Sequence, residues 1–419
     1  MSNSVRAKAE LPRVVILGGG FAGLYAARAL RGAPVAVTLL DRKNHHLFQP
    51  MLYQISTAAL ITAHIAAPIR SILSSQKNCQ VLLAEAKRVD RAARVVETGA
   101  DPIPFDYLIV ATGASHSYFG HDEWAAQAPG LKTLEDALDI RRRVFLAYEN
   151  AEREKDPERR RAFMTFVVIG AGPTGVEMAG ALAEISRLTL ARDFRTIDPK
   201  SARIILVEGV PRVLPPFPED LSAAARTQLE RLGVEVWTGT RVTAIDDAGV
   251  TLGADRVAAR TVIWAAGVQG SDLAKSLGAA MDRSGKIFVR PDLSVPDSAH
   301  IFVAGDLVAL TQDGAPVPGV CPAAMQEGRH AARNVLALVQ GRETAPFRYV
   351  DKGSFAVIGR GAAVGDLFGW KMSGRLAWLA WLAIHITFLI GFRNRLIVLI
   401  GWAYSYFTHR RGARLITGA

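Results

Sequence analysis

The chain is poor in cysteine and has no apolar stretch as long as an export signal near its start. Of its 419 residues only Cys79 and Cys321 are cysteines, and they lie far apart in sequence. A disulfide-stabilised scaffold and a multi-cysteine metal or iron–sulfur site built from this chain alone are therefore excluded, and we predict no metal site. The four-residue apolar run at 14–17 is too short for a signal peptide, so we expect no export signal.

Acidic residues are missing from the last 50 positions. Residues 370–419 hold seven Lys and Arg and no Asp or Glu, so +7 of the formal net charge of +11 lies there. Four of the seven tryptophans lie in the same segment. Basic residues beside apolar runs and tryptophans are typical of a chain that contacts an anionic lipid surface, and this pattern does not indicate a nucleic-acid partner.

The apolar runs in this tail are short. Residues 376–392 form 17 positions without a charge, and residues 396–407 form 12 more. A membrane-spanning helix needs about 20 residues. We therefore predict two helices that lie in the membrane interface. A buried core helix or a dimer interface is the alternative, which leaves a homodimer open.

Two earlier segments repeat one pattern. The apolar run 14–17 leads into Gly18-Gly19-Gly20-Phe21-Ala22-Gly23, and the run 166–169 leads into Gly170-Ala171-Gly172-Pro173-Thr174-Gly175. Continuous apolar runs of this length are expected of strands buried on both faces of a parallel sheet. An Ala/Leu-rich stretch follows each glycine motif. The repeat predicts two βαβ units, and hence two dinucleotide-binding domains.

The glycines of such a motif have separate tasks. The first permits the tight turn, the second lets the backbone approach a pyrophosphate, and the third allows close packing of helix on strand. An acid at the end of the next strand accepts hydrogen bonds from a ribose. Asp41 stands 18 residues after Gly23, and Glu208 stands 33 residues after Gly175. An acid favours NADH over NADPH, although the nearby Arg212 leaves NADPH open.

The segment between the two motifs is highly charged. Residues 133–161 begin with Thr133 and Asp136 at the spacing of a capping box. We predict a solvated helix there, with its arginine clusters at the surface and without specific partners.

Two nucleotide sites in one chain indicate one tightly held flavin and one exchanging nicotinamide. The chain here resembles the two-dinucleotide-binding flavoprotein superfamily, in which the N-terminal motif holds FAD and the inserted motif holds NAD(P)H. Thr112-Gly113 is similar to the second FAD motif of that superfamily, and Gly305-Asp306 is similar to its late motif, whose aspartate binds the FAD ribityl chain. The FAD contacts expected on this basis are Gly18, Gly20, Ala22, Gly23, Asp41, Thr112, Gly113 and Asp306. The NADH contacts expected are Gly170, Gly172, Thr174, Gly175, Glu177, Glu208 and Gly267.

The stretch 44–54 selects a branch of that superfamily. It lacks the Cys-x4-Cys pair of disulfide reductases and, together with residues 170–177, 262–268 and 318–334, resembles type II NADH dehydrogenases. That resemblance implies FAD, NADH as electron donor, a membrane quinone as acceptor and no proton pumping. It also implies peripheral, monotopic attachment through the C-terminus, which we expect on the cytoplasmic face of a bacterial inner membrane.

The same resemblance suggests roles for individual side chains. Glu177 is expected beside the nicotinamide and the flavin, where it assists proton delivery, although an acid in the first turn of a helix also suits the helix dipole. Gln326 matches the second of two glutamines found near the flavin and quinone in this family, while Pro322 replaces the first. Glu177 and Gln326 are thus the catalytic candidates, and His46, Gln49 and Gln326 are candidates for the quinone site.

The predicted fold is α/β, with two Rossmann-like domains and a C-terminal membrane-binding helical tail. The NADH domain is inserted in the FAD domain. We expect the first part of the FAD domain at 1–130, the NADH domain at 131–285, the second part of the FAD domain at 286–345, and the membrane and quinone-access segment at 346–419.

Two other functions stay open at the level of sequence. A sulfide:quinone oxidoreductase would need a redox-active cysteine, for which Cys321 is the candidate. A membrane-tethered flavoprotein that binds NADH and acts mainly through partners would show slow turnover with every quinone.

Overall fold

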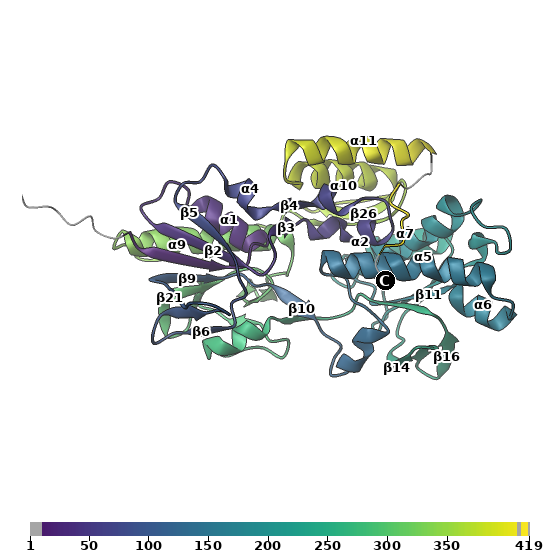
Figure 1. Cartoon of the computed structure of the whole chain (residues 1–419), viewed down its shortest axis with the longest axis horizontal. Coiled ribbons are helices and arrows are strands. Elements are labelled where there is room, and N and C mark those ends of the chain that lie inside the picture. The colour runs from purple at the N-terminus through teal and green to yellow at the C-terminus, as the bar shows by residue number, and fades with distance from the viewer. Residues whose placement is uncertain (1–10, 409–411, 418–419) are drawn as a thin grey trace, which may run out of the picture. The chain divides into compact units, whose positions relative to one another are not determined.

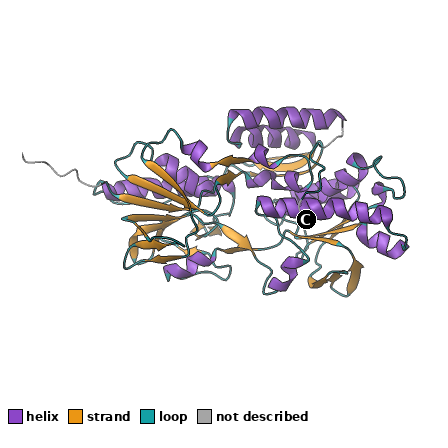
Figure 2. Ribbon diagram, viewed as in Figure 1, coloured by secondary structure: helices purple, strands orange, loops and turns teal. Residues whose placement is uncertain are grey.

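A computed structural model describes residues 11–408 and 412–417. By the density of internal contacts the chain divides into two compact units. The first unit comprises Met1–His46, Ala67–Ser115 and Val268–Asp351. The second unit comprises Leu47–Ala66, His116–Gly267 and Lys352–Ala419. Each unit contains one parallel sheet, and the two sheets are visible as separate fans of strands in Figures 1 and 2.

The first unit is built on a six-stranded sheet that carries the first glycine motif. Its order is β20-β21-β9-β1-β2-β5, and all neighbours except β20 and β21 run parallel. Because β1 lies between β9 and β2, the carboxyl ends of these three strands adjoin the turn that follows β1. The strands are β1 (Arg13–Leu17), β2 (Ala36–Asp41), β5 (Cys79–Leu83), β9 (Tyr107–Val110), β20 (Ser294–Val295) and β21 (Ser298–Val303).

Two helices of the first unit pack against each other: α1 (Phe21–Ala29) and α9 (Cys321–Val339). A Cβ atom on Gly328 would lie 2.0 Å from the carbonyl oxygen of Ala22, so only glycine permits this approach. The remaining elements of this unit are short: α4 (Ile69–Leu73), β6 (Arg88–Asp90), β7 (Val95–Glu97), β8 (Ile103–Pro104), η5 (Asp272–Leu277), β19 (Ile287–Phe288), β22 (Val308–Ala309), β23 (Thr311–Gln312) and β24 (Ala315–Pro316). Four short strands stand where the chain passes between units: β3 (His45–Leu47), β4 (Ala66–Pro68), β10 (Ala114–His116) and β18 (Val268–Gly270).

The second unit contains a four-stranded parallel sheet in the order β13-β12-β11-β17. Every residue of β11 is buried, as the continuous apolar run predicts. An antiparallel sheet, β14-β15-β16, adjoins it in sequence. The strands are β11 (Thr165–Ile169), β12 (Arg203–Val207), β13 (Val234–Trp237), β14 (Val242–Asp246), β15 (Gly249–Leu252), β16 (Asp255–Ala258) and β17 (Thr261–Trp264). The helices and turns around them are η1 (Gln49–Met51), α2 (Leu52–Ser56), α3 (Thr62–Ile65), η2 (Asp122–Ala126), α7 (Pro173–Glu184), the π-helical turn η3 (Ile185–Thr189), η4 (Pro199–Ser201) and α8 (Glu219–Arg231).

The predicted helix at 133–161 is wrong in two respects. The structure has two helices there, α5 (Leu134–Arg153) and α6 (Pro157–Phe163), because Pro157 begins a new helix that Asp156 caps. The capping box of Thr133 and Asp136 is confirmed. However, α5 is amphipathic and buries one face. Among its arginines Arg141 is itself buried, and the next two pair with Asp139.

The C-terminal segment holds a small sheet followed by two helices. The antiparallel strands β25 (Ser354–Gly359), β26 (Ala362–Leu367) and β27 (Trp370–Ser373) were not predicted. The two predicted tail helices are confirmed as α10 (Arg375–Phe388) and α11 (Phe392–Thr408), which lie side by side in Figure 1. Their bounds differ from the apolar runs because the chain turns at Gly391, whose φ is +90°. Among the residues described, no helix combines the length and apolar character needed to cross a membrane.

Helix α7 and strand β25 approach each other through a glycine. A Cβ atom on Gly180 would lie 1.7 Å from the carbonyl oxygen of Ile358. This contact fixes the C-terminal sheet against the helix that follows the second glycine motif.

We predict that Gly180→Ala lowers the unfolding free energy by about 1–3 kcal/mol, because the added methyl group must push helix and strand apart. Thermal or urea unfolding measures the change. Gly401→Ala is the control, since no atom within 4 Å would meet its Cβ and alanine suits a helix. Equal stability of both variants would contradict the assigned contact.

Candidate functional site

The first glycine motif forms a tight strand-to-helix turn. Gly18 has a φ of +101°, and a Cβ there would lie 2.3 Å from the carbonyl oxygen of Ala111. A Cβ on Gly23 would lie 1.8 Å from the carbonyl oxygen of Gly18. By contrast, no atom lies within 4 Å of a Cβ built on Gly20, which precedes α1. The turn is therefore closed on its protein side and open at the helix N-terminus, where a pyrophosphate would bind.

Asp41 is held in place by the same turn. The Gly19 N–H donates to its Oδ2 (2.5 Å) and the Lys43 N–H donates to its Oδ1 (2.6 Å). The carboxylate thus stands at the end of β2 beside the glycine motif. This is the position that the sequence predicts for a ribose contact.

The other predicted FAD residues stand at the ends of neighbouring strands. Thr112 and Gly113 follow β9, and the Thr112 hydroxyl lies 2.5 Å from the Ser271 hydroxyl. Gly305 and Asp306 follow β21, and the φ of Gly305 is +85°. Ala22, Ala111, Ala304 and Ala324 form a small buried cluster at this edge. Side chains of this size leave room for a large planar cofactor, so the residues present fit FAD.

His46 lies at the first glycine motif. Its Nδ1–H donates to the carbonyl oxygen of Gly19 (2.9 Å), and its ring meets Phe21 edge-on. Burial lowers the pKa of His46 to about 4, so the imidazole is neutral. Its Nε2 is a buried acceptor without a hydrogen-bond partner among the described residues. A cofactor hydroxyl at this turn would satisfy that acceptor, which favours an FAD contact over the predicted quinone contact.

Sequence reasoning missed Glu327 on α9. This side chain is 3% exposed, and its Oε2 accepts a hydrogen bond from the Gly305 N–H (2.6 Å). Burial, with a smaller contribution from Asp306, raises its pKa to about 7. A charged residue among the mostly apolar positions of one helix face was the available signal, but nothing in the sequence indicates its partner.

The second glycine motif repeats the geometry of the first. A Cβ on Gly170 (φ +97°) would lie 2.7 Å from the Ala266 nitrogen, and one on Gly175 would lie 1.7 Å from the Gly170 carbonyl oxygen. Gly172 precedes α7 and is open, and Thr174 is exposed in the first turn of the helix. This helix N-terminus therefore offers a second pyrophosphate site.

Glu208 takes the place of Asp41 at the second motif. The Ala171 N–H donates to its Oε2 (2.8 Å) and the Val210 N–H donates to its Oε1 (3.1 Å). Gly267 follows β17 with a φ of +71°, and a Cβ there would lie 2.6 Å from the Phe119 ring. The predicted NADH residues therefore come together at the carboxyl edge of one sheet.

Glu177 is buried in the second turn of α7. Its Oε1 accepts a weak hydrogen bond from the Val357 N–H (3.4 Å). Burial raises its pKa well above the usual value for glutamate, which favours the protonated form of the carboxyl. A buried acid with a raised pKa in the helix that follows the second glycine motif is suited to proton transfer.

Two candidates for the quinone site, Gln326 and Gln49, use their side-chain amides in hydrogen bonds to the backbone. The Gln326 Nε2 donates to the Val350 carbonyl oxygen (3.0 Å), and the Val350 N–H donates to Gln326 Oε1 (3.0 Å). The Gln49 Nε2 donates to the Lys132 carbonyl oxygen (2.9 Å). In these contacts both side chains fix neighbouring backbone.

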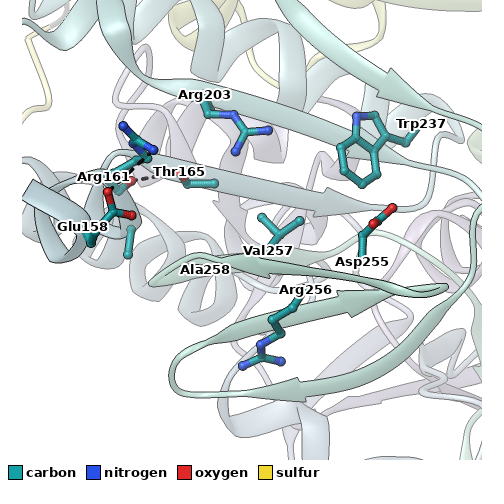
Figure 3. A pocket seen from close by; sticks show the side chains of 10 residues that line it. Glu158, Arg161, Thr165, Arg203, Trp237, Asp255, Arg256, Val257 and Ala258 are labelled. Atoms are coloured by element: carbon teal, nitrogen blue, oxygen red, sulfur yellow. Dashed lines mark hydrogen bonds and ion pairs between the residues drawn. The ribbon is translucent and has the colours of Figure 1, made fainter.

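A pocket of about 370 Å3 lies away from the predicted site (Figure 3). It is at the amino ends of β11 and β12, where Thr165 and Arg203 begin the strands. Its arginines already have acidic partners: Arg203 pairs with Glu235, and Arg256 pairs with Asp246. Dinucleotides bind at the carboxyl edge of such sheets, so this pocket is not the nucleotide site.

Neither Cys79 nor Cys321 forms a disulfide. Burial raises the pKa of the Cys79 thiol to about 11, which keeps it protonated and unreactive. Cys321 begins α9 and is partly buried. The structure thus contains no disulfide within its described residues that would supply the redox pair of the sulfide-oxidising alternative.

The pKa of Glu327 predicts a pH-dependent stability. Between the ordinary glutamate pKa of 4.5 and about 7 the folded state holds a proton that the unfolded state has lost, so this group costs up to about 3 kcal/mol as pH rises through that range. Urea unfolding from pH 5 to pH 8 tests this. The urea midpoint of the wild type should fall relative to that of Glu327→Gln, whereas parallel curves would contradict the assigned protonation.

The chain is similar to known families over most of its length. Residues 12–328 match the model of the pyridine nucleotide-disulphide oxidoreductases, and residues 352–411 match the model of the NDH2 C-terminal domain. The type II NADH:quinone oxidoreductase Ndh of Mycobacterium tuberculosis is 43% identical over 97% of this chain and 90% of its own length.

Solved structures agree on the fold. NDH2 from Plasmodium falciparum in complex with NADH superposes with a TM-score of 0.88 at 18% identity, covering 98% of this chain and all of the other. The sulfide:quinone oxidoreductase of Aquifex aeolicus gives a TM-score of 0.72 at 19% identity, with 92% of each chain covered. Two findings distinguish the type II NADH:quinone oxidoreductases from the sulfide:quinone oxidoreductases. Residues 352–411 match the NDH2 C-terminal domain, and the identity to Ndh is 43% over almost the whole chain. The chain belongs to the type II NADH:quinone oxidoreductases.

Proposed function

We propose that the two units of this FAD-dependent NADH:quinone oxidoreductase have separate tasks, with FAD held by the first unit and NADH by the second. The observation that carries this assignment is the duplicated turn, in which Gly18 with Gly23 and Gly170 with Gly175 close the protein side while Gly20 and Gly172 stay open. The predicted functional segments are the FAD domain at 1–130 and 286–345, the NADH domain at 131–285, and the membrane and quinone segment at 346–419. They do not coincide with the two units, because residues 47–66 and 116–130 lie in the second unit and residues 268–285 lie in the first.

FAD, when bound, supplies the two-electron chemistry that links hydride from NADH to reduction of a quinone. The protein's own groups bind and orient the reactants. Asp41 and Glu208 each hold a glycine-rich turn and present carboxylate oxygen to a ribose. The acidic Glu208 favours NADH because a 2′-phosphate would meet negative charge there.

The N-terminus of α9 contributes an electrostatic effect. Its first N–H groups lack partners within the helix, and Pro322 costs no hydrogen bond at this position. The positive end of the helix dipole stabilises negative charge that develops on a flavin placed before it. Asp306 after β21 would hold the ribityl chain.

Glu177 is proposed as a proton donor. Burial raises the pKa of its carboxyl, and the residue stands two positions after the last glycine of the second glycine motif. Reduction of a quinone to a quinol consumes a proton in addition to the hydride, and a buried acid can provide it.

The quinone contacts remain proposals. Gln326 acts as a positioning residue that holds the backbone at Val350, and Gln49 holds the backbone at Lys132. His46 contributes through the FAD turn rather than by direct contact with the quinone.

The C-terminal helices support attachment to an anionic lipid surface. Leu376 and Leu379 on α10, and Phe392, Leu399 and Ile400 on α11, are exposed large apolar side chains. Exposed Arg375, Arg393 and Arg395 stand at the beginnings of the two helices, where they would meet lipid phosphates. Attachment would be peripheral, on the cytoplasmic face of a bacterial inner membrane, and pairing of these helices between two copies remains compatible with a homodimer.

Stopped-flow absorbance of the flavin tests the function. Detergent-purified protein is mixed with NADH and then with a short-chain ubiquinone or menaquinone. Fast bleaching by NADH and fast recovery with quinone, both at catalytic speed, are expected. Bleaching without recovery would contradict the quinone step and favour a flavoprotein that acts through partners. Bleaching by sulfide that Cys321→Ala abolishes would instead favour the sulfide-oxidising alternative.

Glu208→Ala should raise the KM for NADH by about tenfold or more, because the charged acceptor for the ribose is lost. FAD content should stay at the wild-type level. Asp41→Ala is the reciprocal variant and should lose FAD first. Parallel loss of both nucleotides in the Glu208 variant would overturn the division of tasks.

A further inference from the structure

A second pocket of the second unit lies over Glu177. It has a volume of about 110 Å3 and is formed by α2, α7, β25, α10 and α11. Sites for small organic molecules usually measure about 300–1,000 Å3, whereas one water takes about 30 Å3. The pocket therefore has the size for a short row of waters.

Two carboxyl groups of α7 line this pocket. Glu177 and Glu184 are seven residues apart, which is two helical turns on one face and about 10.5 Å along the axis. Strand β25 runs beside them: the Val357 N–H donates to Glu177, and the Arg360 N–H after the strand donates to Glu184 Oε1 (2.5 Å). The close contact at Gly180 stands between the two and fixes their spacing.

The accessibility of the two acids differs. Glu177 is buried, whereas Glu184 is partly exposed at the end of α7. A row of about three waters between two acids, at hydrogen-bond spacing of about 2.8 Å, spans about 11 Å, which is close to the rise of about 10.5 Å along α7 between these two positions. The pocket therefore contains both a buried acid, Glu177, and an acid that is partly exposed to solvent, Glu184.

The walls offer polar atoms that can hold water. The Trp381 side chain, 2% exposed, lines the pocket, and its Nε1–H has no partner among the described residues. Opposite it the Gln54 Nε2 donates to the Tyr53 hydroxyl (3.1 Å), and the Trp402 Nε1 donates to Gln54 Oε1 (2.8 Å). Buried polar groups of this kind are normally satisfied, and an ordered water would satisfy Trp381.

We propose that this pocket is the route by which protons from solvent reach Glu177, with Glu184 as the carboxylate at its entrance. The inference rests on the proposed role of Glu177 as a proton donor. Trp381, Gln54 and Tyr53 position the waters between the two acids.

The overall reaction, NADH + H⁺ + quinone → NAD⁺ + quinol, fixes the proton balance. NADH supplies two electrons and one proton as hydride, so one proton per turnover comes from solvent. The O–H bond of Glu177 breaks as it gives up this proton. It forms again when a pocket water transfers a proton to Glu177 and regains one by way of Glu184.

Infrared spectroscopy of the carboxylic acid tests the route without turnover. The band of protonated Glu177 is identified by its absence in Glu177→Gln, and its shift on transfer to D2O gives the exchange rate in the enzyme free of NADH and quinone. In Glu184→Gln this exchange should be about tenfold slower, and the exchange rate should recover on addition of formate, a small acid that replaces a proton relay. Exchange at the wild-type rate, or a Glu177 that is already ionised, would overturn the proposal.

Two further variants distinguish the loss of a proton route from a nonspecific effect of substitution on the fold. Glu152→Gln is the matched control, since Glu152 is also a partly exposed helical glutamate that accepts backbone N–H groups, and it does not line the pocket. It should exchange within about twofold of the wild type. Ala181→Leu keeps both acids but fills the pocket, and it should slow exchange as Glu184→Gln does. If Ala181→Leu exchanges normally, the waters do not carry the proton.

The outcomes distinguish this inference from the proposed function. The exchange rate is measured without substrates, so it remains interpretable even if stopped flow shows no reaction with quinone. If the flavin bleaches and recovers normally while the exchange of Glu177 is unchanged in Glu184→Gln, the proposed proton route is wrong and the proposed function is supported.

Discussion

The structure depends on one steric constraint, the contact of a glycine Cα with backbone carbonyl oxygen where a parallel strand turns into a helix. At Gly23 and at Gly175 a Cβ atom would lie within 2 Å of the carbonyl oxygen of the motif's first glycine. The helix can therefore begin directly over the end of the strand, and its N-terminal N–H groups face outward from the sheet edge. The same constraint recurs at Gly180, where it fixes a later strand against α7. The two glycine motifs and the attachment of β25 to α7 thus depend on the same close packing of glycine against a carbonyl oxygen.

The acidic residues of the site fall into two groups, which differ in burial and in the number of backbone N–H groups that they accept. Asp41 and Glu208 each accept two backbone N–H groups of the turns beside them. Glu177 and Glu327 are buried, with at most one backbone donor described for each, and their pKa values are raised. We propose that Asp41 and Glu208 bind nucleotide and that Glu177 exchanges a proton. One residue type therefore serves two purposes because burial differs.

The sequence predicted the elements that have strong local signals. Buried apolar runs followed by glycines fixed both parallel sheets, and Thr133 with Asp136 marked the start of α5. It failed where the signal was weak or non-local. The break before Pro157 was overlooked within a long charged stretch, and the short strands β25 to β27 have no distinctive periodicity. These strands form because β25 packs on α7, a segment about 180 residues earlier in the chain.

Sequence alone determined the fold class, the two nucleotide motifs and the family resemblance, because each depends on residue types at fixed local spacing. Only the tertiary structure decided which side chains lie together. It placed His46 at the turn of Gly19, used the amide of Gln326 to hold Val350, and enclosed a pocket between Glu177 and the C-terminal helices. The physical reason is that burial, and with it protonation, is set by contacts between residues far apart in the chain.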